Sequence, residues 1–323
     1  MPQTITHACF GEDLYNKLPN SIKKKIAYQK KELMMFSQST DALMFYNVYS
    51  IMPGKKYRKI QLTFHKNNTN LFFSTLINYM KDNKYYNDSK TLVFLYGLIC
   101  HFCLDSIAHP YIIYRTGMFN KKDKSTYKYK GMHSYMESYI DNYYLKQKDI
   151  EKFNLKKFCF SKDKFTKELN DSINYSFKNT YNINNMDKVY YKSLNQMNNF
   201  LTLFRLDKYG IKKGVYKFID LITPKSTFPF KSLSYHIDNY DNLDFLNLEK
   251  REWVYPVDNN IKSNKNFFEL YNDALEEAYH IIQEVNSYFF NNKKIDINYL
   301  FKNKSYVTGV DCNLNKKQQF FEF

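Results

Sequence analysis

Apolar residues recur every three or four positions along most of the chain, which is the spacing of one face of an α-helix. This pattern predicts helices at 20–36, 70–80, 89–109, 131–146, 162–178, 186–206 and 264–290. Few segments alternate apolar and polar residues as strands do, so the predicted fold class is all-α. Asp88 and Ser89 cap the most apolar helix, and we expect it to end near His109 because Pro110 follows.

The last third of the chain shows a weaker pattern. The stretch 222–262 holds three of the seven prolines and is expected to be irregular, and 302–323 is expected to be a frayed tail. This third also lacks the alternating strands that a β-sandwich would need. The C-terminal third is therefore expected to add helices to the fold, not a sheet.

The composition agrees with a helical globular protein. The 323 residues are 44% apolar, which suffices for a full core, and the low counts of Gly (8) and Pro (7) disfavour turn-rich β architectures. No run of 18 or more apolar residues occurs, so no transmembrane segment is expected. The five cysteines include a CxxC at Cys100 and Cys103, which we interpret as small core residues because it lies within an apolar helix.

The net charge of +16 permits binding to anionic surfaces but does not identify one. Only four of the 48 cationic residues are Arg, whereas readers of nucleic-acid sequence depend on Arg for bidentate contacts. The N-terminal residues lack a basic stretch followed by an apolar one, so no signal peptide is expected. This predicts a cytoplasmic location, with leaderless release or association with a membrane surface left open.

Candidate chemistry concentrates in the first 140 residues. His101, Asp105 and His109 form HxxxDxxxH, and His133 with Glu137 forms HxxxE. Residues four apart share a helix face, since each such step returns to within about 40° of the first side chain. Asp41, His65 and His7 complete five imidazoles and three carboxylates. This donor set favours zinc and permits more than one ion, and clustered zinc ions are suited to hydrolysing phosphoesters.

The order and spacing of these eight residues resemble the zinc-dependent phospholipase C family of bacteria, whose members include phosphatidylcholine-hydrolysing enzymes and the clostridial α-toxin. The phrases THACFGEDLYNKL, FLYGLICHFCLDSIAHPYI and GMHSYMESYID carry the same likeness. The resemblance covers about residues 4–145. It implies a helical domain with a multinuclear zinc cleft, which we expect residues 1–210 to form. Residues 211–323 are expected to be a helical extension that packs on it.

The resemblance also implies a set of ligands for two to three Zn²⁺ ions. His65, His101, Asp105 and Asp41 would hold one ion, and His109, His133 and Glu137 a second. His7 and a bridging Asp105 would hold the third. Asp41 would in addition act as general base beside the attacking water.

Three departures from the family bear on function. Secreted members begin with a Trp that completes the third zinc, whereas this chain begins Met1-Pro2, and the Pro2 amine would have to substitute. The spacing from Asp105 to His109 is shorter than in the secreted enzymes. Ala42 follows Asp41 where choline-specific members carry an aromatic residue, so a choline head group is not implied.

Phospholipid hydrolysis to diacylglycerol and a phosphorylated head group, by zinc-activated water, is the predicted function. The first alternative is a zinc-dependent single-strand nuclease, since related zinc nucleases share the scaffold, although their last ligand is typically Asp rather than Glu. The second alternative is a weakly active or non-enzymatic member stabilised by metal. The expected partners are accordingly a phospholipid or other phosphodiester and a peripheral membrane surface, with nucleic acid as the alternative.

Overall fold

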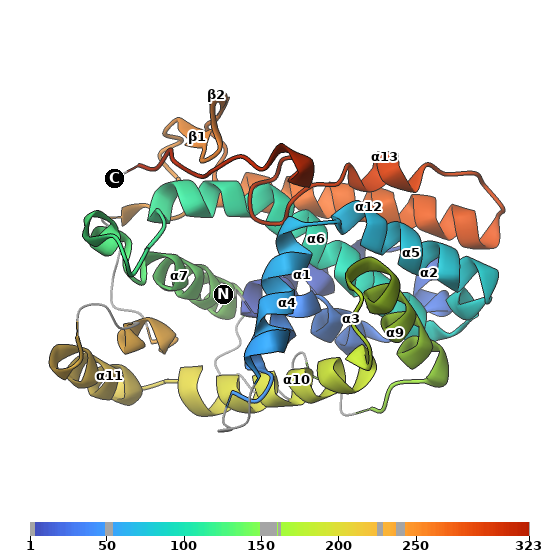
Figure 1. The fold of residues 1–323 in the computed structure, drawn as a ribbon, viewed down its shortest axis with the longest axis horizontal. Helices are drawn as coiled ribbons and strands as arrows, with labels where there is room; N and C mark the ends of the chain where they lie inside the picture. The colour runs from blue at the N-terminus through green and yellow to red at the C-terminus, as the bar shows by residue number, and fades with distance from the viewer. Residues whose placement is uncertain are drawn as a thin grey trace.

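The protein is an assembly of helices with one small β-hairpin (Figure 1). The computed structural model describes residues 4–48, 54–148, 160, 163–224, 229–236 and 243–322. Its α-helices are α1 (Thr4–Lys17), α2 (Asn20–Lys25), α3 (Lys30–Phe36), α4 (Lys55–Lys66), α5 (Thr69–Asp82), α6 (Ser89–Thr116), α7 (Met132–Gln147), α9 (Lys167–Tyr181), α10 (Met186–Phe200), α11 (Ile211–Ile222), α12 (Phe267–Phe290) and α13 (Ile297–Phe301).

Shorter elements connect these helices. They are the 3₁₀ helices η1 (Ser39–Phe45), η2 (Tyr85–Asn87), η3 (Lys124–Tyr129), η5 (Phe230–Leu233) and η7 (Cys312–Leu314), the π-turn η4 (Leu201–Arg205), and the strands β1 (Trp253–Tyr255) and β2 (Asp258–Ser263). The two strands pair antiparallel, and they form the one sheet among the described residues. The all-α prediction is therefore confirmed, although the hairpin at 253–263, most of which lies in the stretch expected to be irregular, was missed.

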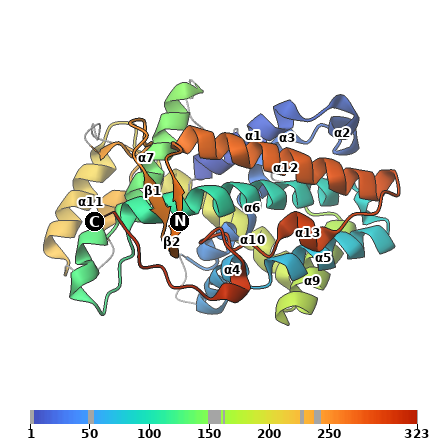
Figure 2. The same cartoon turned by 90° about the horizontal axis from the view of Figure 1, so that it is seen from above.

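Helix α6 is the centre of the fold. Almost all of its side chains are buried, and α12 runs alongside it in both views, while α1 and α3 pack against it from other directions (Figures 1 and 2). By length and composition α6 could cross a membrane, but 94% of its most apolar window is buried inside the protein. Its hydrophobicity is thus that of a core helix.

Helix α6 does not end near His109 as predicted; it continues through Pro110 to Thr116. Proline lacks the N–H that would bond to the carbonyl four residues earlier, which here belongs to Ser106. The loop at Gly309 lies against that carbonyl, since a Cβ on Gly309 would stand only 2.6 Å from the Ser106 oxygen. Gly309 has a φ of +68°, a conformation that favours glycine, so the loop can approach the helix where the proline sits.

Two other predictions were wrong in detail. The helix expected at 20–36 is divided into α2 and α3, because Ala27 and Tyr28 adopt positive φ values. The tail expected at 302–323 is folded as far as described: Tyr306 is fully buried, and its N–H donates to the carbonyl of His65. This C-terminal loop, residues 302–322, therefore contacts the helix that carries the candidate ligand His65.

Candidate metal centre

Four helices and one 3₁₀ turn bring all eight predicted ligand side chains into one region. His7 comes from α1, Asp41 from η1 and His65 from α4. Helix α6 contributes His101, Asp105 and His109, and α7 contributes His133 and Glu137. Their ligand atoms form three groups that could each hold a metal ion: His7 with His101 and Asp105, Asp41 with His65 and His101, and His109 with His133 and Glu137.

Asp105 lies between these groups. Its Oδ1 is 3.2 Å from His7 Nε2, and its Oδ2 is 3.1 Å from His101 Nε2. The same Oδ2 lies 3.7 Å from His65 Nε2 and 3.5 Å from His109 Nδ1. Burial alone would raise the pKa of Asp105, but the surrounding imidazoles of His101, His109 and His7 hold it well below its usual range. Asp105 is therefore an anion placed to bridge ligand groups.

Asp41, His65 and His101 form a deeply buried triangle. His65 Nε2 is 3.3 Å from Asp41 Oδ1 and 3.1 Å from His101 Nε2, and His101 Nε2 is 3.9 Å from the same carboxylate oxygen. Asp41 Oδ1 also accepts a 2.7 Å hydrogen bond from the Gln61 side-chain amide. Burial lowers the pKa of His65 to about 4, so this imidazole is neutral at pH 7.

His109, His133 and Glu137 form a more accessible group. Glu137 Oε1 is 2.9 Å from His133 Nε2 and 3.7 Å from His109 Nε2. The side chains of His133 and His109 are 33% and 18% exposed, whereas that of Glu137 is buried. Burial opposes protonation of His109, yet Asp105 and Glu137 raise its pKa to about 9. A metal ion arriving at this group must displace that proton.

Hydrogen bonds at the far side of the imidazoles fit metal binding. The Nδ1 atoms of His65, His101 and His109 lie 2.7, 3.0 and 2.9 Å from the backbone carbonyls of Gln61, Ser37 and Tyr306. Because a carbonyl only accepts, each Nδ1 carries a proton and donates it, which leaves Nε2 to face the centre. Metal-binding histidines are oriented in this way in proteins.

The buried polar atoms support the same interpretation. Asp105 Oδ2 and His7 Nδ1 are buried without a partner in hydrogen-bond geometry among the described residues. A buried oxygen left unpaired costs free energy, about 1–3 kcal/mol for a neutral group and more for a charged one. Cations coordinated among the Nε2 atoms and carboxylates would satisfy this cluster, so the residues present fit zinc.

Several residues that orient the site were missed from the sequence. Gln61 could have been found, since it precedes His65 by one helical turn; Ser37 and Tyr306 act through backbone carbonyls and give no sequence signal. Asp141 lies one turn after Glu137 and accepts from the backbone N–H groups of Ile5 and Thr6. These bonds fix the first turn of α1, and with it His7, against α7.

Two further predictions concern the CxxC cysteines and the N-terminal amine. Cys100 and Cys103 are free thiols buried in the core, in agreement with the interpretation of the CxxC. The Pro2 amine that would complete a third zinc lies outside the described residues, so this part of the prediction stays a prediction.

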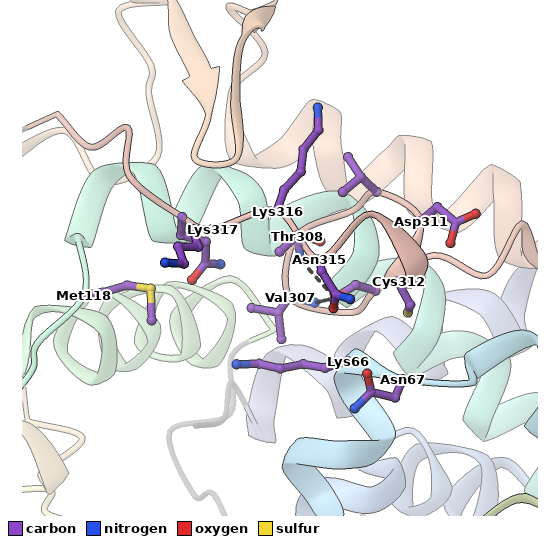
Figure 3. Close-up of a pocket in the computed structure, with 13 residues that line it drawn as sticks. Lys66, Asn67, Met118, Val307, Thr308, Asp311, Cys312, Asn315, Lys316 and Lys317 are labelled. Atoms are coloured by element: carbon purple, nitrogen blue, oxygen red, sulfur yellow. Dashed lines mark hydrogen bonds between the residues drawn. The ribbon is translucent and has the colours of Figure 1, made fainter.

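A cavity of about 160 Å³ opens beside the ligands. Asp41, Gln61 and His133 line it together with apolar side chains, and Val307 of the C-terminal loop forms part of its wall. Val307 also lines a larger neighbouring pocket of about 440 Å³, shown in Figure 3, which is bordered by Lys66, Lys316 and Lys317. Lys66 extends beneath Val307 in this view, whereas Lys316 points away from the pocket and binds Asp258. The candidate centre thus has a partly apolar cavity at its ligands and a pocket with lysines next to it.

Comparison with known proteins identifies the family. A family model described as zinc-dependent phospholipase C matches residues 6–197, more than half of the chain, and this range includes all eight candidate ligands. No curated protein and no solved structure gives a significant match. The matched range and the helical fold agree with the likeness seen in the sequence, and the chain belongs to the zinc-dependent phospholipase C family.

Proposed function

We propose that this protein is a phospholipase C that hydrolyses phospholipids to diacylglycerol and a phosphorylated head group. The observation that carries the proposal is the convergence of five imidazoles and three carboxylates beside one cavity, with the imidazole Nε2 atoms directed inward. Family membership supports the zinc dependence and the substrate class.

The eight side chains would hold two to three zinc ions. Asp41, His65 and His101 would form the first set, with Asp105 Oδ2 beside both imidazoles, and His109, His133 and Glu137 the second. His7 with the bridging Asp105 would offer the third position, since the single free nitrogen of His101 serves the first. When bound, zinc makes water acidic enough to react at neutral pH and stabilises charge on the phosphoryl oxygens.

Asp41 is the proposed general base. It lines the cavity, and the Gln61 amide holds its carboxylate in place. Asp41 accepts a proton from the attacking water as the new oxygen–phosphorus bond forms. The bond from phosphorus to the glycerol oxygen then breaks, and the departing oxygen takes up a proton to give diacylglycerol.

The surroundings of the cavity indicate how a phospholipid would lie. Leu62 and Ile113 line the cavity and suit the glycerol and the first part of the acyl chains. The scissile phosphate would lie at the ligands, and the neighbouring pocket beyond Val307, with Lys66 and Lys317, suits the polar head group attached to that phosphate. Since Ala42 is small and buried, this arrangement does not depend on an aromatic residue beside Asp41.

The test is product analysis with purified zinc-loaded protein. Vesicles of phosphatidylcholine, phosphatidylethanolamine and phosphatidylglycerol are incubated separately, and diacylglycerol and phosphorylated head groups are measured, with a chelator as the control for zinc. The Asp41→Asn variant should lose activity by about 100-fold or more while keeping the fold. Cleavage of single-stranded nucleic acid without cleavage of any phospholipid would replace the proposal by the nuclease alternative.

A further inference from the structure

Helix α11 presents an unusual apolar surface. Ile211, Val215, Phe218, Leu221 and Ile222 are all exposed, with Phe218 64% and Leu221 83% accessible. At 100° per residue these five side chains occupy an arc of about 120° on one side of the helix. An apolar stripe of this kind normally faces the core of a globular protein. Here it faces outward.

The outward direction is supported by Gly214, which lies within the same arc. No atom of the described residues stands within 4 Å of the position that a Cβ on Gly214 would occupy. Two further apolar side chains next to the helix, Leu203 and Tyr209, are 61% and 76% exposed. The described residues thus leave the apolar face of α11 uncovered along the whole helix.

Polar contacts hold the opposite face of α11. The Asp207 carboxylate accepts from the backbone N–H groups of Lys212 and Lys213 and from the hydroxyl of Ser234. At the other end, the Asp220 carboxylate accepts from the N–H groups of Phe230 and Lys231. The helix is therefore anchored without using its apolar stripe, which remains available for another surface.

Helix α11 is connected to the candidate metal centre through η5. It packs against η5, and η5 packs against α7, which carries His133 and Glu137. Ser138 on α7 donates to the carbonyl of Ser232 in η5, and Pro229 lies directly over Gly131 at the start of α7. In Figure 1 the helix lies at the lower left, at the periphery beyond α7 and far from α13.

Lysines border the apolar stripe. Lys217 lies on one side of it, and Lys208 precedes the helix beside the exposed ring of Tyr209. Lys212 lies on the other side and donates its ammonium to the carbonyls of Leu203 and Leu206. The two nearby carboxylates, Asp207 and Asp220, are directed at backbone N–H groups of the protein. An apolar face with flanking lysines matches the chemistry of helices that lie in the interface of an anionic membrane.

We propose that α11 docks the protein on anionic lipid membranes, with its apolar stripe inserted among the acyl chains and its lysines at the head groups. The choice of a lipid surface rests on the proposed function, since a phospholipase must reach its substrate in a membrane. Docking through α11 would hold α7 and the candidate metal centre close to that surface.

The experiment is vesicle flotation of the full zinc-loaded chain. The vesicles contain equal amounts of phosphatidylserine and phosphatidylcholine as phosphonate analogues, in which a carbon replaces the scissile oxygen. The double variant Phe218→Ser, Leu221→Ser should bind about tenfold or more weakly than the wild type. The matched control, Leu248→Ser with Tyr299→Ser, removes two exposed apolar side chains elsewhere and should change binding less than about twofold.

Raising the salt concentration should also weaken binding of the wild type, because screening reduces the attraction between lysines and anionic lipids. Equal flotation of the wild type and the α11 variant, or no flotation of the wild type, would overturn the proposal. So would a wild-type dimer that becomes monomeric in the α11 variant without any vesicle binding, since the stripe would then cover a second copy.

A soluble chromogenic phosphodiester separates the docking proposal from the proposed function. Turnover of this substrate by the wild type and by the α11 variant at equal rates, with lost flotation of the variant, supports both proposals. Flotation that depends on α11 without any hydrolysis supports docking alone. Hydrolysis with flotation that does not depend on α11 supports the enzyme alone.

Discussion

Two of the three ligand groups in the candidate metal centre share their ligand types but differ in burial. The deep group, Asp41, His65 and His101, is almost inaccessible, with side-chain exposures of 7%, 3% and 0%. The shallow group, His109, His133 and Glu137, has one imidazole that is 33% exposed. Asp105 contacts members of both groups. Identical chemistry placed at two depths predicts one tightly held ion and one that exchanges readily.

The difference arises from the elements that carry the ligands. The deep group combines side chains from the buried middle of α6, from η1 and from α4. Within α4, the backbone carbonyl of Gln61 accepts from His65 and fixes its ring. The shallow group combines the end of α6 with the first turns of α7, and its His109 is fixed by the C-terminal loop through Tyr306.

The largest effect is expected from Asp105, because it joins both groups. Asp105→Asn keeps the size of the side chain but removes the bridging charge. Zinc content should fall by at least one ion per chain, and activity by about 1,000-fold, which is the loss of several kcal/mol of transition-state stabilisation. Elemental analysis and phospholipid turnover measure this, with the exposed Asp123→Asn as control. Unchanged zinc content in Asp105→Asn would contradict the bridging role.

The second prediction compares the two groups directly. His133→Ala should lose one zinc and about 100-fold in activity while melting near the wild-type temperature, since the side chain is partly exposed. His101→Ala should also lower the melting temperature clearly, because it removes a fully buried ring that stacks on His7 at 4.3 Å. Equal melting temperatures for the two variants would show that depth has no structural consequence.

The third prediction concerns protons in the shallow group. Because the pKa of His109 is raised to about 9 in the metal-free chain, this imidazole is protonated at pH 7, and zinc binding must release its proton. Apparent affinity for this ion should therefore increase about tenfold per pH unit up to about pH 9 and then level off. Calorimetry in buffers of different ionisation enthalpy counts the protons released.

Two histidine variants provide the control for this count. His109→Ala should release about one proton fewer than the wild type. His133→Ala should leave the proton released by His109 unchanged. Burial lowers the pKa of His133, so this imidazole is neutral at pH 7 and has no proton of its own to release. Proton release that is unaffected by His109→Ala would remove His109 as the source.

The smallest effect is expected from Gly309→Ala. A Cβ at this position would lie 2.6 Å from the Ser106 carbonyl and would push the C-terminal loop away from α6. The carbonyl of Tyr306 would then shift from His109, so the shallow ion should bind a few-fold more weakly, at the lower end of effects seen for outer hydrogen bonds. Gly214→Ala, which has open space, is the matched control. Chelator titration detects the change, and a shift confined to the deep ion would contradict this account.

The parts of the fold that nearby residues determine could be predicted from the sequence, and the parts that distant residues determine could not. The apolar period along α6 and the capping residue Asp88, which accepts from the Thr91 N–H, are contained in the sequence, so the start of α6 was predicted correctly. Its end was not, because proline normally ends a helix, and the loop that packs against Pro110 comes from residues nearly two hundred positions later.

The same division holds for the candidate site. The sequence alone determined which side chains are available: the spacing HxxxDxxxH places three donors on one helix face, and the order of all eight resembles the family that the comparison shows. Only the tertiary structure decided which donors meet, how deeply each is buried, and which carbonyls orient the imidazoles. The outward face of α11 belongs to this second class too, since helical periodicity predicts an apolar stripe but not the side to which it turns. Spacing acts within one element, whereas burial and pairing depend on contacts between residues that are distant in the chain.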